Sequence, residues 1–262
     1  MKDVFYKYGD RIKVKPDVED GSAYFYSGDM SVHMNPQYVA NGDTIHRQYQ
    51  TAFHEFGHNI DFLSGHDNGG GYISSDYKNG LLPKTIKKDW DNYKVSTFKK
   101  DPLKYIYGDT EEEKLFYFRS SLRSGASDED RDLFKDLSHK LRSGELSITD
   151  VFNNPEYGDR AVRAVMKYAF NDETAISQIK SLGLDKAAVG NVSDAIEFCT
   201  GVSYPIGVGH GASYWDDVNG ATEFFAEVLD SKAANPASME QMRKYFPNAV
   251  KVVEDILKEI TK

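Results

Sequence analysis

The sequence predicts an α+β protein that is mostly helical, with a small β-hairpin near its N-terminus and a long helical insert. Three features indicate this fold class. Residues 23–34 contain two short runs of strand-forming residues around a turn. Residues 45–63 have apolar side chains at helical spacing. Residues 83–200 hold several helical segments separated by Ser, Gly, Asn and Pro.

The first 40 residues are expected to be extended, and a hairpin is their clearest element. Ala23–Tyr26 and Met30–Met34 are rich in aromatic and apolar residues that favour strands. The intervening Ser27-Gly28-Asp29 provides a glycine-containing turn, as in short hairpin connections. We therefore predict two antiparallel strands here.

A helix is expected over roughly residues 44–64. Its apolar residues recur at steps of four and three, which places them on one buried face; they are Ile45, Tyr49, Ala52, Phe56, Ile60 and Leu63. The stretch Asn41–Thr44 supplies N-cap candidates, and Ser64-Gly65 supplies a stop.

This helix contains the sequence His54-Glu55-Phe56-Gly57-His58, an HExxH motif. Residues i and i+4 share a helix face, so both imidazoles can bind one metal ion while Glu55 reaches a water molecule on that metal. His54 lies about 200° around the helix from Phe56, so the metal face is opposite the apolar stripe. On a helix, the motif is typical of a zinc metallopeptidase with the glutamate as general base. A surface helix with two incidental histidines is the alternative.

The predicted hairpin has a candidate role beside this helix. A strand next to the metal helix of a zinc peptidase can pair with an extended peptide, so Met30–Met34 is a candidate substrate-binding edge. An ordinary hairpin that covers the core is the alternative.

Residues 83–200 are predicted to be mainly helical, and the charged runs within them to be solvated faces. Thr110 and Ser127 are followed by acidic residues that suit the first turn of a helix. The predicted helices are Pro83–Val95, Thr110–Leu122, Asp128–Leu141, Asp159–Phe170, Glu173–Ser181 and Ser193–Thr200.

A catalytic zinc usually has three protein ligands, and Glu223 is the best candidate for the third. It lies in a segment that reads as a helix with apolar residues packed inward; these are Phe224, Phe225, Val228 and Leu229. Glu223 and Glu227 are four residues apart and share a face. We assign Glu223 to the metal, and Glu227 to a hydrogen bond with the free ring nitrogen of a ligating histidine. A solvated acidic stripe that includes Asp230 is the alternative.

Other residues remain candidates for the site. His66 follows His58 by eight residues, and His210 lies in a glycine-rich loop before the acidic helix. Asp61 returns to the metal face two turns after His54 and could orient a ligand or a partner from the loop. The remaining histidines are expected to be ordinary surface or core residues; they are His33, His46 and His139.

The composition excludes several classes of protein. A net charge of −9 argues against non-specific nucleic-acid binding, which needs a basic surface. No apolar run approaches the roughly 20 residues of a membrane span, and the N-terminus has no secretory hydrophobic region. The single cysteine, Cys199, excludes an internal disulfide. We therefore expect neither a nucleic-acid nor a membrane partner.

The motif pair HEFGHNID and EFFAE resembles the catalytic domain of anthrax lethal factor and, more loosely, the clostridial Pro-Pro endopeptidases. This resemblance implies a zincin-like, gluzincin-type metalloendopeptidase with Zn²⁺ on His54, His58 and Glu223. It also implies a tyrosine before the ligand glutamate that stabilises the oxyanion. Tyr214 is nine residues before Glu223, and Tyr204 is the alternative.

The sequence is also similar to the zincin-like terminal regions of phage minor head proteins, through segments 41–46, 192–196 and 209–215. This resemblance covers most of the chain and implies one zincin-like domain over residues 1–262, with His210 and Tyr214 at the rim of the site. It leaves two main hypotheses. One is a zinc metallopeptidase that acts on a peptide or protein substrate. The other is a phage or prophage structural or interaction domain, with phage head proteins as partners and zinc in a structural or vestigial role.

A phage-encoded toxin or effector is a third hypothesis. The expected location is cytoplasmic or virion-associated. The insert of about 150 residues between the metal helix and Glu223 is longer than in lethal factor, which argues for a different substrate or partner.

Overall fold

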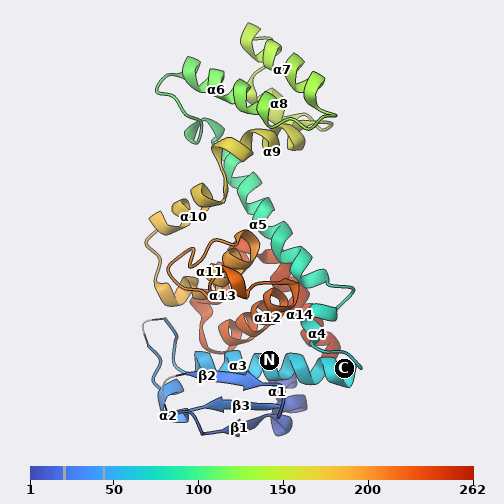
Figure 1. The fold of residues 1–262 in the computed structure, drawn as a ribbon, viewed down its shortest axis with the longest axis vertical. Coiled ribbons are helices and arrows are strands. Elements are labelled where there is room, and N and C mark those ends of the chain that lie inside the picture. The colour runs from blue at the N-terminus through green and yellow to red at the C-terminus, as the bar shows by residue number, and fades with distance from the viewer. Residues whose placement is uncertain (20–21, 44) are drawn as a thin grey trace. The chain divides into compact units, whose positions relative to one another are not determined.

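The computed structural model describes residues 1–19, 22–43 and 45–262. The protein is α+β and mostly helical, as predicted, and it has a three-stranded sheet near the N-terminus that includes a strand beyond the predicted hairpin (Figure 1). The chain divides into two compact units, one of residues 1–90 and 182–262 and the other of residues 91–181. The second unit lies within the predicted helical insert, whereas residues 83–90 and 182–200 of that insert belong to the first unit.

The sheet of the first unit contains β1 (Lys13–Lys15), β2 (Ala23–Tyr26) and β3 (Ser31–Met34) in the order β1-β3-β2. β2 and β3 are antiparallel, with Phe25 opposite Val32, which confirms the predicted hairpin. β1 pairs with β3 in parallel on the other side. The prediction of a substrate-binding edge at residues 30–34 is therefore wrong, because β3 is the central strand, and β2 lies at the edge of the sheet instead.

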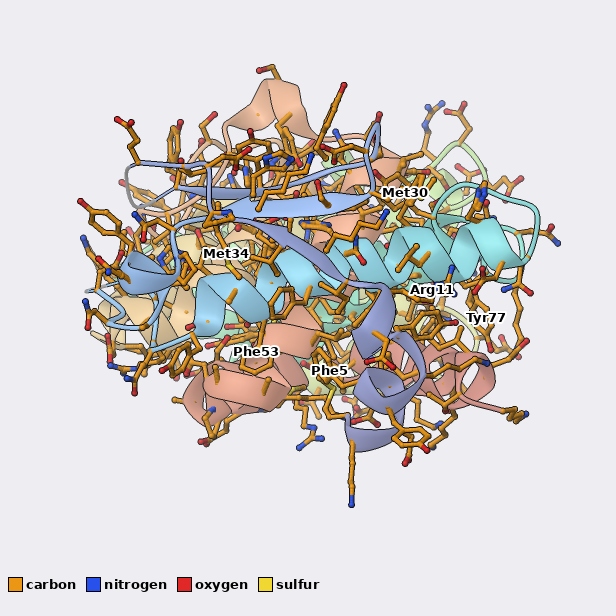
Figure 2. All side chains as sticks on the ribbon, turned by 90° about the horizontal axis from the view of Figure 1, so that it is seen from below. Phe5, Arg11, Met30, Met34, Phe53 and Tyr77 are labelled. Atoms are coloured by element: carbon orange, nitrogen blue, oxygen red, sulfur yellow. The ribbon has the colours of Figure 1, made fainter. Side chains whose placement is uncertain are left out.

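The expectation of an extended N-terminal region is wrong at α1 (Lys2–Tyr8) and α2 (Pro36–Val39). α1 packs against α3 (Gln50–Asp67), the helix of the HExxH motif. The ring of Phe5 on α1 meets Phe53 on α3 edge-on, with centroids 5.7 Å apart (Figure 2). Phe5 also meets Phe56, so the N-terminal helix lies on the side of α3 away from His54 and His58.

α3 begins later than predicted because a turn occupies the expected first residues. The Asp43 side chain accepts hydrogen bonds from the backbone N–H groups of Ile45 and His46, at 2.6 and 2.7 Å. Such local bonds compete with helix formation. Tyr49, the N-cap residue, has a left-handed conformation with φ of 61°. The predicted cap at Thr44 lies outside the described residues.

α3 also continues past the predicted stop at Ser64-Gly65 and ends at Asp67. Gly65 is buried, and a Cβ there would lie 2.2 Å from the carbonyl oxygen of Gly71. The glycine is therefore needed where the loop after α3 crosses the helix rather than as a helix terminator. The loop leads into the short helix α4 (Ile73–Asp76).

Four C-terminal helices complete the first unit: α11 (Lys186–Thr200), α12 (Asp217–Ala234), α13 (Pro236–Tyr245) and α14 (Pro247–Ile260). Figure 1 shows α3 between the β-sheet and α12, so the HExxH helix is covered on both sides. The apolar residues of the acidic segment are buried in α12 as predicted; they are Phe224, Phe225, Val228 and Leu229.

The chain passes from the first unit into the second within α5 (Leu81–Lys100). The second unit holds α6 (Glu111–Ser124), α7 (Arg131–Ser143), α8 (Ile148–Asn153), α9 (Gly158–Ala169) and α10 (Asp172–Ser181).

Four of these helices, α6, α7, α9 and α10, confirm predicted ones, whereas α8 was not predicted. Thr110 caps α6 in a reciprocal capping box with Glu113, whereas the cap residue of α7 is Asp130 rather than Ser127. The rings of Phe98, Phe118 and Phe152 meet in the core of this unit. In the part of the chain that the structure describes, no helix has the length and apolar character needed to cross a membrane.

Candidate metal centre

The candidate centre depends on a close approach between α3 and α12. Gly57, inside the HExxH motif, faces Ala226 of α12, and a Cβ added at Gly57 would lie 2.7 Å from the Ala226 Cα atom. Because both residues are small, the two backbones can come together. This approach brings the histidines of α3 to the acidic face of α12.

Replacing Gly57 by alanine is expected to destabilise the fold by about 1–3 kcal/mol, because the added methyl group overpacks the helix contact. Gly190→Ala is the matched control, since Gly190 lies within α11 and a Cβ there meets no atom within 4 Å. That control is expected to stabilise the protein by about 0.5–1 kcal/mol, because alanine has the higher helix propensity. Urea unfolding measures both changes, and equal effects of the two substitutions would contradict the packing argument.

Three side chains converge on one point between the helices. The Nε2 atoms of His54 and His58 are 3.0 Å apart. Glu223 Oε2 lies 3.2 Å from His54 Nε2 and 3.4 Å from His58 Nε2. A tetrahedral ion with bonds of about 2.0–2.1 Å requires ligand atoms separated by roughly 3.3 Å. The group can therefore hold a metal ion.

The charges and hydrogen bonds of the three groups also fit a cation. Glu223 Oε2 is buried and has no hydrogen-bond partner among the described residues. Burial raises the pKa of Glu223, but the adjacent imidazoles outweigh burial and hold that pKa well below its usual range. Burial lowers the pKa values of His54 and His58, but the surrounding acidic groups raise both above the usual value. A metal ion that binds here must displace protons from the imidazoles, so its affinity falls at low pH.

Asp230 orients His54 from behind. Its Oδ2 atom lies 3.3 Å from His54 Nδ1, which leaves Nε2 of the same ring directed at the metal position. Asp230 is 2% exposed and accepts hydrogen bonds from Asn191 Nδ2 at 2.8 Å and from Gln50 Nε2 at 3.3 Å. These polar contacts fix the carboxylate and therefore the ring that it contacts.

The sequence predicts that Glu227 accepts the hydrogen bond from the free ring nitrogen of a ligating histidine. In the structure, Asp230 contacts that nitrogen of His54 instead. Asp230 is seven residues after Glu223, roughly 20° away around an ideal helix, whereas Glu227 is roughly 40° away in the opposite sense. Glu227 lies beside Asp194 of α11, and burial together with that carboxyl group raises the pKa of Glu227 well above its usual value. The alternative of a solvated acidic stripe is wrong, because Glu223, Glu227 and Asp230 are all at most 4% exposed.

Glu55, the predicted general base, is 8% exposed. Its Oε2 atom accepts a hydrogen bond of 2.8 Å from the backbone N–H of Phe25 in β2. Because this N–H points away from β3, the edge strand can use it to hold the Glu55 carboxylate. The sheet thus positions a residue of the HExxH helix.

Tyr214 reaches the centre from the loop before α12. Its hydroxyl donates a hydrogen bond to Glu223 Oε1, which leaves Oε2 for the metal position. Burial and the Glu223 carboxylate raise the pKa of Tyr214, so the phenol keeps its proton at neutral pH. The alternative residue, Tyr204, is 54% exposed on the same loop.

His210 stacks on Tyr214, with ring centroids 4.5 Å apart. Its Nε2 atom lies 3.6 Å from Asp194 Oδ2 and 3.8 Å from Glu223 Oε2. His210 therefore lies beside the three converging groups. The resemblance to phage minor head proteins implies a position at the rim of the site. Burial and the Glu223 carboxylate raise the pKa of Asp194 to about 7.

These groups surround a cavity of about 300 Å³. One wall is formed by β2 and the other by the loop before α12 and the first turns of α12. The lining residues are Ala23, Tyr24, Phe25, His54, Glu55, His58, Tyr72, His210, Tyr214, Asn219, Thr222 and Glu223. The candidate metal position thus opens onto a space in which a small part of a substrate can bind.

Asp61 and His66 lie apart from the three converging groups. Asp61 is fully buried and accepts hydrogen bonds from the backbone N–H and the hydroxyl of Ser74, at 2.8 and 2.5 Å. Asp61 therefore anchors α4, the short helix that follows the loop after α3. Burial raises the pKa of Asp61 to about 7. His66 is exposed at the end of α3 and stacks on Phe62.

The other three histidines lie outside the centre. His33 is buried in β3 between Asp17 and Ser31, whereas His46 is partly exposed and His139 is exposed. Sequence reasoning missed the roles of Asp230 and Phe25. The spacing of Asp230 from Glu223 could have revealed the first, but the second involves a backbone N–H and has no sequence signal.

No family model, curated protein or solved structure matches this chain. The class of site is therefore defined by its own residues: an HExxH helix and an acidic helix that together can hold a metal ion beside a carboxylate in a cavity.

Proposed function

We propose that the protein is a zinc-dependent metallopeptidase that hydrolyses peptide bonds. The observation that carries this proposal is the presence of Glu55 in the cavity onto which His54, His58 and Glu223 converge. Two imidazoles and one carboxylate are a typical ligand set of catalytic zinc, which keeps a fourth position open. A purely structural zinc site has no need for the additional carboxylate.

Each group has a defined task in the proposed reaction. A zinc ion held by His54, His58 and Glu223 would supply Lewis-acid chemistry, lowering the pKa of a bound water molecule and polarising the peptide carbonyl. Glu55 accepts a proton from the attacking water and transfers it to the leaving amine as the C–N bond breaks. Tyr214 turns from Glu223 and donates its hydroxyl proton in a hydrogen bond to the carbonyl oxygen as negative charge develops there.

The substrate is proposed to be a peptide or a protein segment that lies beside β2. Ala23, Tyr24 and Phe25 of this edge strand line the cavity. An edge strand offers its free backbone groups to an extended peptide. In β2 the N–H of Phe25 is already bound to Glu55, so the peptide is proposed to use the other outward backbone groups of the strand. This proposal replaces the substrate edge that the sequence had indicated at β3.

Hydrolysis of a peptide library by the zinc-loaded protein tests the proposal. We expect cleavage that a chelator abolishes and added zinc restores. Cleavage that persists in the chelator after the metal has been removed would overturn the zinc mechanism. Stoichiometric zinc without cleavage of any peptide would favour the structural or interaction role in a phage particle.

Replacing Tyr214 by phenylalanine is expected to lower kcat by about 10²–10³-fold, because one donor to the developing oxyanion is lost. KM and zinc content should change little, since the metal ligands remain. Tyr204→Phe is the matched control, because this tyrosine is half-exposed on the same loop. Steady-state kinetics of both variants measure the effect, and a larger loss in Tyr204→Phe would reverse the assignment of the two tyrosines.

A further inference from the structure

The loop between α11 and α12 needs an external support for its conformation. It contains five residues with positive φ, which are Gly201, Tyr204, Gly207, Gly209 and Gly211. Tyr204 is the only one of the five with a side chain, and a left-handed conformation is unfavourable for a non-glycine residue. The loop nevertheless places His210 and Tyr214 at the cavity.

The support comes from Glu197 on α11, a fully buried carboxylate that does not belong to the described lining of the cavity. It accepts hydrogen bonds from three backbone N–H groups of the loop. The N–H of Tyr204 donates to Oε1 at 2.9 Å, and the N–H of His210 donates to Oε2 at 2.8 Å. The N–H of Gly211 is shared between both oxygens at 3.1 and 3.2 Å. Bonds to a buried charged acceptor are among the stronger ones in proteins.

Ser193, one turn earlier on the same face of α11, adds two further contacts. Its hydroxyl donates to the carbonyl oxygen of Val208 at 2.7 Å and accepts from the N–H of Ile206 at 3.0 Å. Two side chains of one helix therefore bind backbone groups of five residues between Tyr204 and Gly211, in the central part of the loop.

Gly209 shows that the loop and Glu197 are closely fitted. A Cβ at Gly209 would lie 2.3 Å from Glu197 Oε2, and the φ of 156° also disfavours a side chain. Only glycine allows the loop backbone to come this close to the carboxylate.

Short links connect Glu197 to the groups at the cavity. His210 is bound to Glu197 through its own N–H, and its ring stacks on Tyr214. The N–H of Tyr214 donates to the carbonyl oxygen of Gly211 at 3.0 Å, and Gly211 is itself bound to Glu197. A shift of the loop at Glu197 therefore moves both rings.

We propose that Glu197 is a positioning residue. It holds the loop between α11 and α12 in the conformation that presents Tyr214 and His210 to the substrate. This inference rests on the proposed peptidase function. Glu197 acts through the loop backbone and does not touch the substrate.

Glu197→Gln tests the proposal in the zinc-loaded protein. The amide keeps the size of the side chain but replaces one acceptor oxygen by a donor that faces backbone N–H groups. We expect kcat to fall by about 10²-fold, as a displacement of about 1 Å can cause. Zinc content should remain as in wild type, because the ligands lie on α3 and α12. Unchanged kcat would overturn the proposal.

A double-mutant cycle with Tyr214→Phe separates positioning from a general structural effect. If Glu197 acts through Tyr214, removal of the hydroxyl should cost much less in the Glu197→Gln background than in wild type. Fully additive losses in kcat would overturn the proposal.

Gly209→Ala provides a second variant that disturbs the same contact without changing charge. Gly207→Ala is its matched control, because Gly207 also has positive φ, at 87°, but a Cβ there meets no atom within 4 Å. We expect Gly209→Ala to lower kcat at least tenfold more than Gly207→Ala. Equal effects of the two substitutions would overturn the proposal.

Amide hydrogen exchange distinguishes failure of this inference from failure of the proposed function. In Glu197→Gln, the amides of Tyr204, His210 and Gly211 should exchange faster than in wild type. Faster exchange with unchanged peptide hydrolysis would overturn the positioning role alone. A wild-type protein that carries zinc and hydrolyses no peptide would overturn the peptidase function and this inference with it.

Discussion

Glu55→Gln is expected to retain zinc and to lose peptide hydrolysis by about 10²–10⁴-fold, the usual contribution of a general base. The amide cannot accept the proton of the attacking water. It still has an oxygen that can accept the N–H of Phe25, so the side chain should keep its place. The proposed metal ligands His54, His58 and Glu223 are unchanged, which separates this variant from one that loses the metal.

The measurement combines kcat for a cleaved peptide with zinc content by mass spectrometry on the same preparation. Glu156→Gln is the matched control, because Glu156 is an exposed glutamate in the second unit. It should behave as wild type in both assays. Full activity in Glu55→Gln would remove Glu55 from the proposed mechanism, and loss of zinc would show that the variant disturbs the ligands instead.

Glu223→Ala is expected to lower zinc content from about one ion per chain to a small fraction of that value, because two ligands remain where a catalytic site uses three. Added zinc should stabilise the wild type but not the variant. A ligand that binds only the folded state stabilises it by about 2.7 kcal/mol at a free concentration 100 times its Kd. Thermal unfolding with and without zinc therefore provides a second readout.

Glu227→Gln is the matched control for Glu223→Ala. Glu227 lies on the same helix one turn away and has a raised pKa, so a neutral amide of the same size resembles its protonated form. This variant should bind zinc nearly as wild type does. If Glu227→Gln loses zinc and Glu223→Ala keeps it, the assignment of the two glutamates is reversed.

The sequence alone was sufficient for features that follow from the geometry of one helix. The spacing of His54 and His58 places them on one face of α3, and the periodicity of the acidic segment places Glu223 on the polar side of α12. The hairpin was also predictable, because a strand-turn-strand pattern is local. The role of Asp230 was not predicted, although its seven-residue spacing from Glu223 places it on the same helix face as that candidate ligand.

The apolar and glycine patterns were misleading where other contacts, either local hydrogen bonds or tertiary packing, decided the backbone. The side chain of Asp43 stabilises a turn, so α3 begins several residues later than predicted. Gly65 does not end the helix; it is needed where the loop after α3 passes close to the helix backbone. Residues 2–8 form a helix that packs on Phe53, although they were expected to be extended.

Only the tertiary structure decided which strand forms the edge of the sheet and how the site is held together. β1 pairs with β3 across a long connection, which leaves β2 beside the cavity. The N–H of Phe25 reaches Glu55, and the carboxylate of Glu197 binds three N–H groups of the loop that follows α11. Every residue except proline carries a backbone N–H, so residue identity does not indicate which one a carboxylate will bind. These partners are chosen when the packed helices and strands bring them together.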